Sequence, residues 1–156
     1  MTQSLHGRVI AITGGARGIG FATATALTRL GAKVAIGDID EAKLKESATQ
    51  LGLTSYRKLD VTDTESFEAF LDDVEATLGP IDVLVNNAGI MPAGRIADEP
   101  DAVTRRILDI NVLGVITGSK LAVRRMLPRG RGHVVNIASL AGEIYTPGLA
   151  TYCASK

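Results

Sequence analysis

Near its start the chain reads Val9-Ile10-Ala11-Ile12-Thr13-Gly14-Gly15-Ala16-Arg17-Gly18-Ile19-Gly20. An apolar, β-branched run followed by a glycine-rich turn predicts a buried strand that leads directly into a helix. Glycines in such a turn let a pyrophosphate approach the free N–H groups of the helix N-terminus. The alternative is an ordinary glycine-rich turn without a ligand. The predicted phosphate site consists of Gly14, Arg17, Gly18, Ile19 and Gly20.

Short apolar runs alternate with longer helical patterns along the chain. The predicted strands are Val9–Thr13, Lys33–Asp38, Tyr56–Asp60, Val83–Asn86 and Val134–Ala138. The predicted helices cover about 18–30, 40–51, 63–78 and 100–127, with N-caps at Asp40 and Asp63 and C-caps near Gly31, Gly52 and Gly79. Continuous apolar strands are typical of a sheet covered on both faces. The sequence therefore predicts a doubly wound α/β domain with a parallel sheet of five strands.

The composition argues against a nucleic-acid-binding protein and against a membrane protein. Seventeen Lys and Arg balance seventeen Asp and Glu, so no charge excess points to nucleic acid or to a membrane surface. No apolar run approaches the roughly 18 residues of a membrane span, and residues 1–8 lack the pattern of a signal peptide. The single cysteine, Cys153, cannot form an internal disulfide, and His6 and His133 lack the companions of a metal site. We expect a cytoplasmic protein without a bound metal.

Acidic residues end the second and third predicted strands. Asp38 lies twenty residues after Gly18, where a carboxylate can accept hydrogen bonds from the adenosine ribose and repel a 2′-phosphate. This favours NAD over NADP, although Arg17 offers a cation that a 2′-phosphate could meet. Asp60 and Val61 are candidates to recognise the adenine edge. The alternatives are a strand-end or N-cap acid for Asp38 and an ordinary turn residue for Asp60.

Tyr152 and Lys156 are four residues apart and therefore lie on one face of a helix. Two unit charges roughly 5 Å apart interact by about 3 kcal/mol at an effective dielectric constant of about 20. The ammonium group would therefore stabilise the phenolate and let the tyrosine exchange protons near neutral pH, as an acid–base catalyst must. The same spacing also arises by chance in many helices.

Over its whole length the chain resembles the short-chain dehydrogenase/reductase family. The resemblance rests on residues in the family's order: the glycine loop, Asn86-Asn87-Ala88-Gly89, Asn111, Ser139 and Tyr152-x-x-x-Lys156. It implies a Rossmann fold and an enzyme that transfers a hydride between a nicotinamide cofactor and a secondary alcohol or ketone. It also implies a homo-oligomer, a dimer or a tetramer.

The resemblance assigns a role to each of these residues. Tyr152 would be the acid–base, with Lys156 stabilising its phenolate and holding the nicotinamide ribose. Ser139 would bind the reacting oxygen, and Asn111 would hold a water that links Lys156 to solvent. Independently of the family, hydride transfer makes or removes an alkoxide-like oxygen, which needs a proton donor and a second hydrogen-bond donor. The cofactor cleft would also be lined by Asn87, Ala88 and Gly89.

Members of the family generally continue well beyond the Tyr-x-x-x-Lys helix. Residues 1–156 would then form a dinucleotide-binding domain that is incomplete at its C-terminus, without the rest of that helix, two more strands and the loop over the substrate. The fifth strand would become an uncovered sheet edge. We expect residues 1–156 alone to bind nucleotide weakly and to show no detectable turnover.

Small residues recur every four positions in the helix predicted for 100–127, at Gly114, Gly118 and Ala122. Such a row lets another element approach closely. The partner is either this chain's own sheet or neighbouring helix, or the same helix of a second subunit.

Two other functions remain open. One is a nucleotide-binding module for sensing or assembly without catalysis; the other, a methyl-donor-binding domain, gives no reason for the Tyr-Lys pair. The segments expected to shape a substrate pocket are Met91, Pro92 and Ala93 and residues 142–149. They are largely apolar, with Glu143 as the exception, which favours a substrate with an apolar body.

Overall fold

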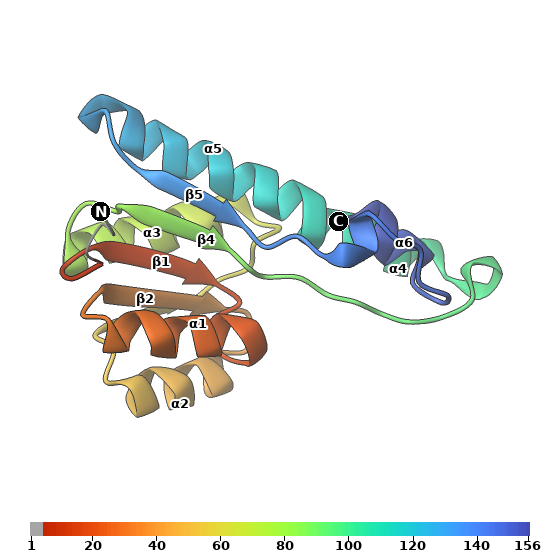
Figure 1. The fold of residues 1–156 in the computed structure, drawn as a ribbon, viewed down its shortest axis with the longest axis horizontal. Coiled ribbons are helices and arrows are strands. Elements are labelled where there is room, and N and C mark those ends of the chain that lie inside the picture. The colour runs from red at the N-terminus through yellow and green to blue at the C-terminus, as the bar shows by residue number, and fades with distance from the viewer. Residues whose placement is uncertain (1–4) are drawn as a thin grey trace.

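The computed structural model describes residues 5–156, which form a five-stranded parallel sheet with helices on both faces (Figure 1). The strand order is β3-β2-β1-β4-β5. The strands are β1 (Val9–Thr13), β2 (Lys33–Asp38), β3 (Ser55–Lys58), β4 (Val83–Asn86) and β5 (His133–Asn136). The predicted doubly wound fold is confirmed. Residues 1–4, part of the segment examined for a signal peptide, lie outside the described residues.

Helices α1 (Gly18–Arg29) and α2 (Glu41–Leu51) cover one face of the sheet, and α3 (Thr64–Leu78) and α5 (Gly114–Met126) cover the other (Figure 1). Successive residues of β1 alternate between the two cores. Val9 and Ala11 join the core under α3 and α5, and Ile10 and Ile12 join the core under α1 and α2. All five residues of β1 are buried, which explains its continuous apolar sequence. None of the helices within residues 5–156 has the length and hydropathy to span a membrane.

The helix predicted for 100–127 is present as one helical run from Asp101, but its hydrogen-bonding pattern changes along its length. The structure has α4 (Asp101–Leu108), a π-helical turn (Asp109–Leu113), α5 and a short 3-10 turn (Leu127–Arg129). The π-helical turn contains Asn111, one of the predicted site residues. Single π-helical turns inside α-helices are frequent at functional sites. Helix α4 and the short helix α6 (Ala150–Ala154) lie together beyond the carboxyl ends of the strands (Figure 1).

Element ends differ from the prediction by a few residues. β3 ends at Lys58 and not at Asp60, because Asp60 turns the chain by accepting hydrogen bonds from Thr62. β5 ends two residues before the predicted Ala138. The predicted caps of α2 and α3 are confirmed, whereas the C-cap of α1 is Leu30, and Gly31 follows it with φ +79°.

The row of small residues on α5 faces the chain's own core. A Cβ on Gly118 would lie 2.4 Å from Asn86 Oδ1 and 2.5 Å from Phe67 Cζ, so only glycine lets α5 approach β4 and α3 this closely. Ala122 belongs to the same buried cluster. Of the two interpretations of this row, intramolecular packing is therefore confirmed.

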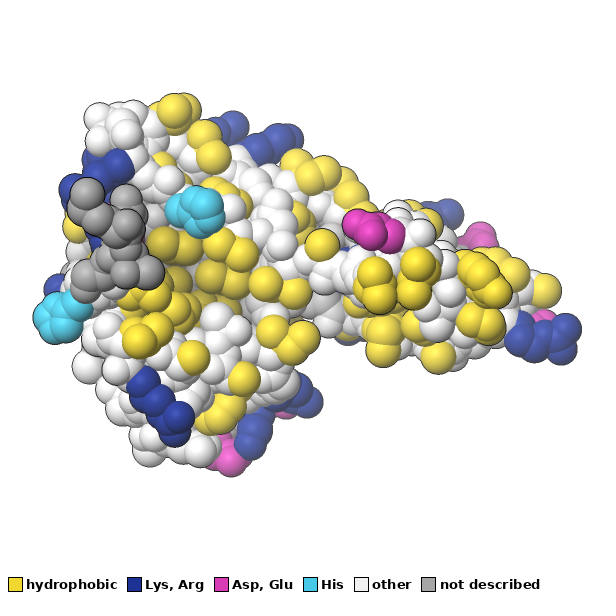
Figure 2. Space-filling model, viewed as in Figure 1, with side chains coloured by type: hydrophobic (Ala, Val, Ile, Leu, Met, Phe, Trp, Pro, Cys, Tyr) yellow, Lys and Arg dark blue, Asp and Glu magenta, His cyan; other side chains and the backbone are white. Residues whose placement is uncertain are grey.

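β5 forms one edge of the sheet, as expected. Its residues are half-buried or exposed. On the side of α1 and α2, Val83, Val135 and Ile137 are only partly buried. Figure 2 shows hydrophobic side chains gathered over this part of the molecule.

Candidate active site and nucleotide cleft

A cleft of about 990 Å³ lies at the carboxyl ends of the strands, where ligands of open α/β sheets bind. Its volume is at the upper end of the roughly 300–1,000 Å³ that is usual for ligand pockets. Nearly all the predicted cofactor residues line it: Gly14, Arg17, Gly18, Ile19, Asp38, Asp60, Val61, Asn87, Ala88 and Gly89. The structure thus brings together residues from four separate strand ends.

The glycine loop is held by its own close contacts. Gly14 has φ +64°, a conformation that favours glycine. A Cβ on Gly20 would lie 2.2 Å from the Gly14 carbonyl oxygen, so the absence of a side chain at Gly20 lets α1 pack closely against the turn. Gly20 does not line the cleft. Helix α1 has Arg17 at its N-cap, with no side-chain cap and no acidic residue in its first turn. Its free N–H groups and positive dipole end are therefore open to an anion.

Asn87 and Thr13 join the glycine loop to the end of β4. The Asn87 side chain donates from Nδ2 to the carbonyl oxygens of Thr13 (2.9 Å) and Gly14 (3.0 Å). In return, the Thr13 hydroxyl oxygen accepts from the backbone N–H groups of Asn87 and Ala88, both at 3.0 Å. These four bonds fix the floor of the cleft between β1 and β4.

Asp38 is buried, and its carboxylate accepts from Ala16 N (3.0 Å) and from Asp40 N (3.1 Å). It therefore ties the glycine loop to the end of β2 while bordering the cleft. Arg17 forms an ion pair with Asp40 in the same cleft. The backbone N–H of Lys43 and the Arg17 guanidinium hold the pKa of Asp40 below its usual value. The loop cation is thus already paired with an acid.

Asp60 and Val61 lie at the turn after β3. Asp60 Oδ1 accepts from the backbone N–H of Thr62 (2.9 Å) and from its hydroxyl (2.7 Å), which is the turn geometry that aspartate favours. Val61 is buried against α5, where a Cβ on Gly114 would lie 3.0 Å from Val61 Cγ2. The turn is therefore held both by its own hydrogen bonds and by the packing of α5.

Lys156 lies beside Tyr152 and close to one residue of the cleft. Its Nζ is 5.8 Å from the centre of the Tyr152 ring and donates to the Ile137 carbonyl at 3.0 Å. A Cβ on Gly89, which lines the cleft, would lie 3.6 Å from the same Nζ. Tyr152 and Lys156 are not among the residues that line the cleft, but Lys156 Nζ lies next to it at Gly89.

Ser139 lies just past β5 and caps a short 3-10 helix (Leu140–Gly142). Its Oγ accepts from Ala141 N at 3.2 Å, and among the described residues none takes its hydroxyl proton. That proton is free for another acceptor.

Asn111 is buried and fastens three segments together. Its Oδ1 accepts from Ile90 N, and its Nδ2 donates to Ile90 O and to Ser155 Oγ, each at 2.9 Å. Because both amide protons are used, only Oδ1 has remaining capacity for a water. The side chain thus holds α6 and the segment after β4 against the π-helical turn.

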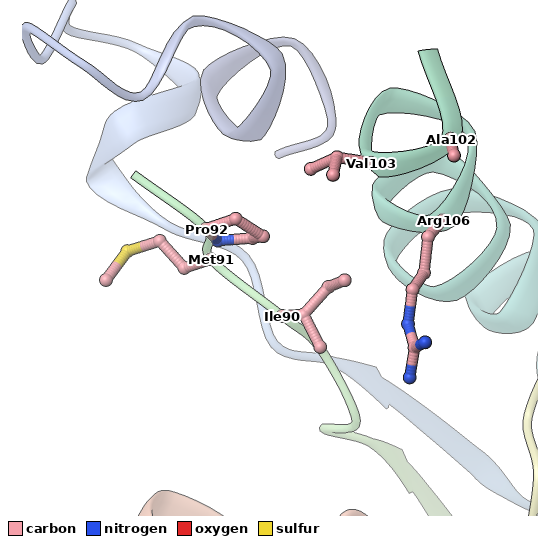
Figure 3. Close-up of a pocket in the computed structure, with 6 residues that line it drawn as sticks. All are labelled: Ile90, Met91, Pro92, Ala102, Val103 and Arg106. Atoms are coloured by element: carbon pink, nitrogen blue, oxygen red, sulfur yellow. The ribbon is translucent and has the colours of Figure 1, made fainter. Parts of the chain in front are cut away.

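Gly94, which directly follows the predicted pocket residues Met91, Pro92 and Ala93, donates its backbone N–H to Gly148 O of the predicted segment 142–149 at 2.9 Å. Met91 and Pro92 also line a second pocket of about 630 Å³, with Ile90 on the same segment (Figure 3). Its other wall is α4, which contributes Ala102, Val103 and Arg106. Arg106 is the one charged residue among those that line this pocket.

The sequence did not indicate how much of the cleft comes from α4 and the turn that follows it. Arg105, Arg106 and Asp109 contribute charges that no motif predicted. A possible signal was their place within six residues before Asn111, on the helix that leads into the site. The lining residues that were not predicted as ligands are Ile39, Asp40, Leu59, Thr62, Ile90, Ala102, Arg105, Arg106, Asp109 and Ile110.

Comparisons with known proteins agree with this geometry. Residues 8–156 match the family described as short chain dehydrogenase. The chain is 41% identical to 2-(S)-hydroxypropyl-CoM dehydrogenase 3 of Xanthobacter autotrophicus, covering 100% of this chain and 63% of that protein. It is 39% identical to 3-alpha-(or 20-beta)-hydroxysteroid dehydrogenase of Mycobacterium bovis, covering 100% and 60%. The crystal structure of NAD+-bound xylitol dehydrogenase superposes with a TM-score of 0.92 at 33% identity, covering 99% and 61%. The chain thus spans less than two thirds of the length of these relatives.

Proposed function

The chain belongs to the short-chain dehydrogenase family, and on this basis we propose that the whole protein is an NAD-dependent oxidoreductase acting on a secondary alcohol or ketone. One observation carries the proposal: the Lys156 ammonium lies beside the Tyr152 ring and against Gly89 of the cleft. A nucleotide-binding module without catalysis would not need a cation and a phenol at this place.

The described residues fit a nicotinamide dinucleotide. The uncapped N-terminus of α1 suits the pyrophosphate, because its N–H groups are free and its dipole favours an anion. The Asp38 carboxylate has two backbone donors and retains lone pairs for ribose hydroxyls. Asp60 and Val61 border the same cleft where an adenine edge would lie.

Charge favours NAD over NADP at the β2 end of the cleft. Asp38 and Asp40 are two acids, and Arg17 is the single cation of the glycine loop. Because Arg17 is paired with Asp40, a 2′-phosphate would meet the Asp38 carboxylate without a free cation from the glycine loop to balance it. The nicotinamide, when bound, supplies the hydride acceptor or donor.

The protein's own residues would manage the proton. Tyr152 would pass it to or from the substrate oxygen. Lys156 would stabilise negative charge on the phenol, and it retains two N–H donors beyond its bond to the Ile137 carbonyl. Ser139 would donate its free hydroxyl proton to the same oxygen. Asn111 would keep α6 in place and offer Oδ1 to a water. Two donors aimed at one developing oxyanion are what hydride transfer to a carbonyl requires.

A substrate with an apolar body is consistent with the exposed apolar side chains near the site, among them Met91, Leu140, Ile144 and Tyr145. Relatives act, by their names, on compounds as different as a hydroxysteroid and hydroxypropyl-CoM. A homo-oligomer is supported by the face of α5 opposite Gly118, where Leu113, Ile116 and Val123 are exposed.

The test is a Tyr152→Phe variant of the whole protein, assayed with NAD and a panel of secondary aliphatic, alicyclic and steroid alcohols by the absorbance of reduced nicotinamide. General acid–base catalysis is worth about 10²–10⁴-fold, so kcat should fall by that factor while NAD binding in calorimetry is retained. Unchanged turnover would favour the non-catalytic module. We also expect residues 1–156 alone to bind NAD weakly without turnover, and NAD-dependent oxidation by this fragment would contradict that.

A further inference from the structure

Helix α6 has two neighbouring faces that make different contacts. Tyr152 and Lys156, four residues apart, lie on one face, and Lys156 Nζ on that face approaches Gly89. Thr151 and Ser155, also four residues apart, are both buried and hydrogen-bonded to residues of the α4 side. The position of the phenol therefore depends on how these two side chains are anchored.

The two anchors lie at opposite ends of α6. The Ser155 hydroxyl oxygen accepts a hydrogen bond from Asn111 Nδ2 at 2.9 Å. Thr151 donates its hydroxyl proton to Glu99 Oε1 at 2.6 Å. Glu99 lies just before α4 and has no place in the motifs or in the cleft lining.

Glu99 is itself held firmly. Its Oε1 also accepts from the Thr104 hydroxyl at 2.5 Å, so one oxygen joins α4 to α6. Distances of about 2.5–2.7 Å are typical of hydroxyl groups that donate to a charged carboxylate. Hydrogen bonds from the Thr104 hydroxyl, which has the larger effect, and from the Thr151 hydroxyl hold the pKa of Glu99 below its usual value. Glu99 is therefore charged at neutral pH, and its bond to Thr151 is one of the stronger kinds of hydrogen bond.

We propose that Glu99 is a positioning residue for Tyr152, acting through the Thr151 hydroxyl to fix the rotation of α6 about its axis. The inference rests on the proposed function, in which the phenol must lie at the substrate oxygen. Because Thr151 directly precedes Tyr152, loss of the Thr151–Glu99 hydrogen bond would rotate or displace the phenol. A misplacement of about 1 Å costs roughly 10²-fold in rate.

The pair of threonines supplies a matched comparison. Thr151→Val removes the bond to α6 and keeps the shape of the side chain, whereas Thr104→Val removes the bond to α4 from the same carboxylate oxygen. A positioning role predicts that Thr151→Val and Glu99→Ala lower kcat by about tenfold or more. Thr104→Val should lower kcat by less than about threefold, and Thr151→Ser, which restores the hydroxyl, should recover most of the rate.

The experiment measures kcat and KM of the whole protein with NAD and the fastest alcohol of the panel, together with NAD affinity by calorimetry. We expect kcat to fall while NAD affinity stays within about twofold, because neither Glu99 nor Thr151 lines the nucleotide cleft. Glu99→Gln, which keeps an acceptor oxygen, should retain more activity than Glu99→Ala. It also serves where the alanine variant fails to fold.

The outcomes separate this inference from the proposed function. Turnover within about twofold of wild type in both Glu99→Ala and Thr151→Val, beside an inactive Tyr152→Phe, overturns the positioning role alone. Equal losses of kcat in Thr104→Val and Thr151→Val also overturn it, because Glu99 would then act by stabilising α4. Unchanged turnover in Tyr152→Phe overturns the proposed function, and the positioning role falls with it.

Discussion

The Asp38 carboxylate, which lines the nucleotide cleft, accepts a hydrogen bond from the buried backbone N–H of Ala16 at 3.0 Å. The acid proposed to bind ribose therefore also holds the glycine loop against the end of β2. Its second oxygen accepts from Asp40 N at 3.1 Å, at the turn that leads into α2. A change at Asp38 must act on the scaffold as well as on the ligand.

We predict that Asp38→Ala destabilises the protein even without nucleotide. It would leave the buried N–H of Ala16 without an acceptor, at a cost of about 1–3 kcal/mol in the free energy of unfolding. Urea unfolding of the apo protein measures this. The control is Asp98→Ala, which removes only an exposed ion pair and should change stability by less than about 0.5 kcal/mol. Equal effects of the two variants would mean that the Asp38 bonds do not hold the loop.

Asp40→Ser tests whether the pairing of Arg17 favours NAD. Serine can still cap α2, but it frees the guanidinium for a 2′-phosphate. Because exposed ion pairs are worth about 0–1 kcal/mol, we expect NADP affinity to rise by up to about fivefold, with NAD affinity nearly unchanged. Calorimetric titration with both nucleotides measures this. Adding Arg17→Ala to the same variant should abolish the gain, and a gain that survives would assign it to another residue.

Burial on both faces of the sheet is what made the fold predictable. Each residue of β1 lies in a core, so the strand appears in the sequence as an unbroken apolar run. The π-helical turn was not predictable in the same way, because local propensity continues through it. The side chain of Asn111 in this turn makes two hydrogen bonds with the backbone of Ile90, twenty-one residues away, and no local sequence pattern indicates such a contact.

The part of the site that lies at the ends of strands could be predicted from the sequence. Gly14 and Asp38 each follow or end a predicted strand, and parallel strands bring such positions to one edge. Arg105 and Arg106 were missed because their place in the cleft depends on how α4 packs across it. The anchoring of Thr151 by Glu99 was missed for the same reason, since it joins two elements across fifty-two positions of sequence.

Gly20→Ala should destabilise the protein although alanine is the better helix former. The added Cβ would lie 2.2 Å from the Gly14 carbonyl oxygen, a backbone atom that cannot move without opening the loop. Overpacking costs about 1–3 kcal/mol, against a propensity gain of about 1 kcal/mol at most. We expect a lower Tm by differential scanning calorimetry and weaker NAD binding. Gly94→Ala is the control, because a Cβ there meets nothing within 4 Å; an equal drop in Tm would show that sterics at Gly14 are not the cause.

Glu99 should make stability depend on pH below its ordinary titration range. Its folded-state pKa is lowered from 4.5 by the Thr104 and Thr151 hydroxyls, so its stabilising contribution is complete above that value. The contribution is lost as the pH falls through the lower, folded-state pKa. Glu99→Gln should therefore be less stable than wild type at pH 7 and approach it as the pH falls below 4.5, measured by urea unfolding. Glu68→Gln, at an exposed site without a carboxylate hydrogen bond among the described residues, should show no such convergence. A difference between wild type and Glu99→Gln that stays constant from pH 7 to pH 3 would contradict the charge-assisted bonds.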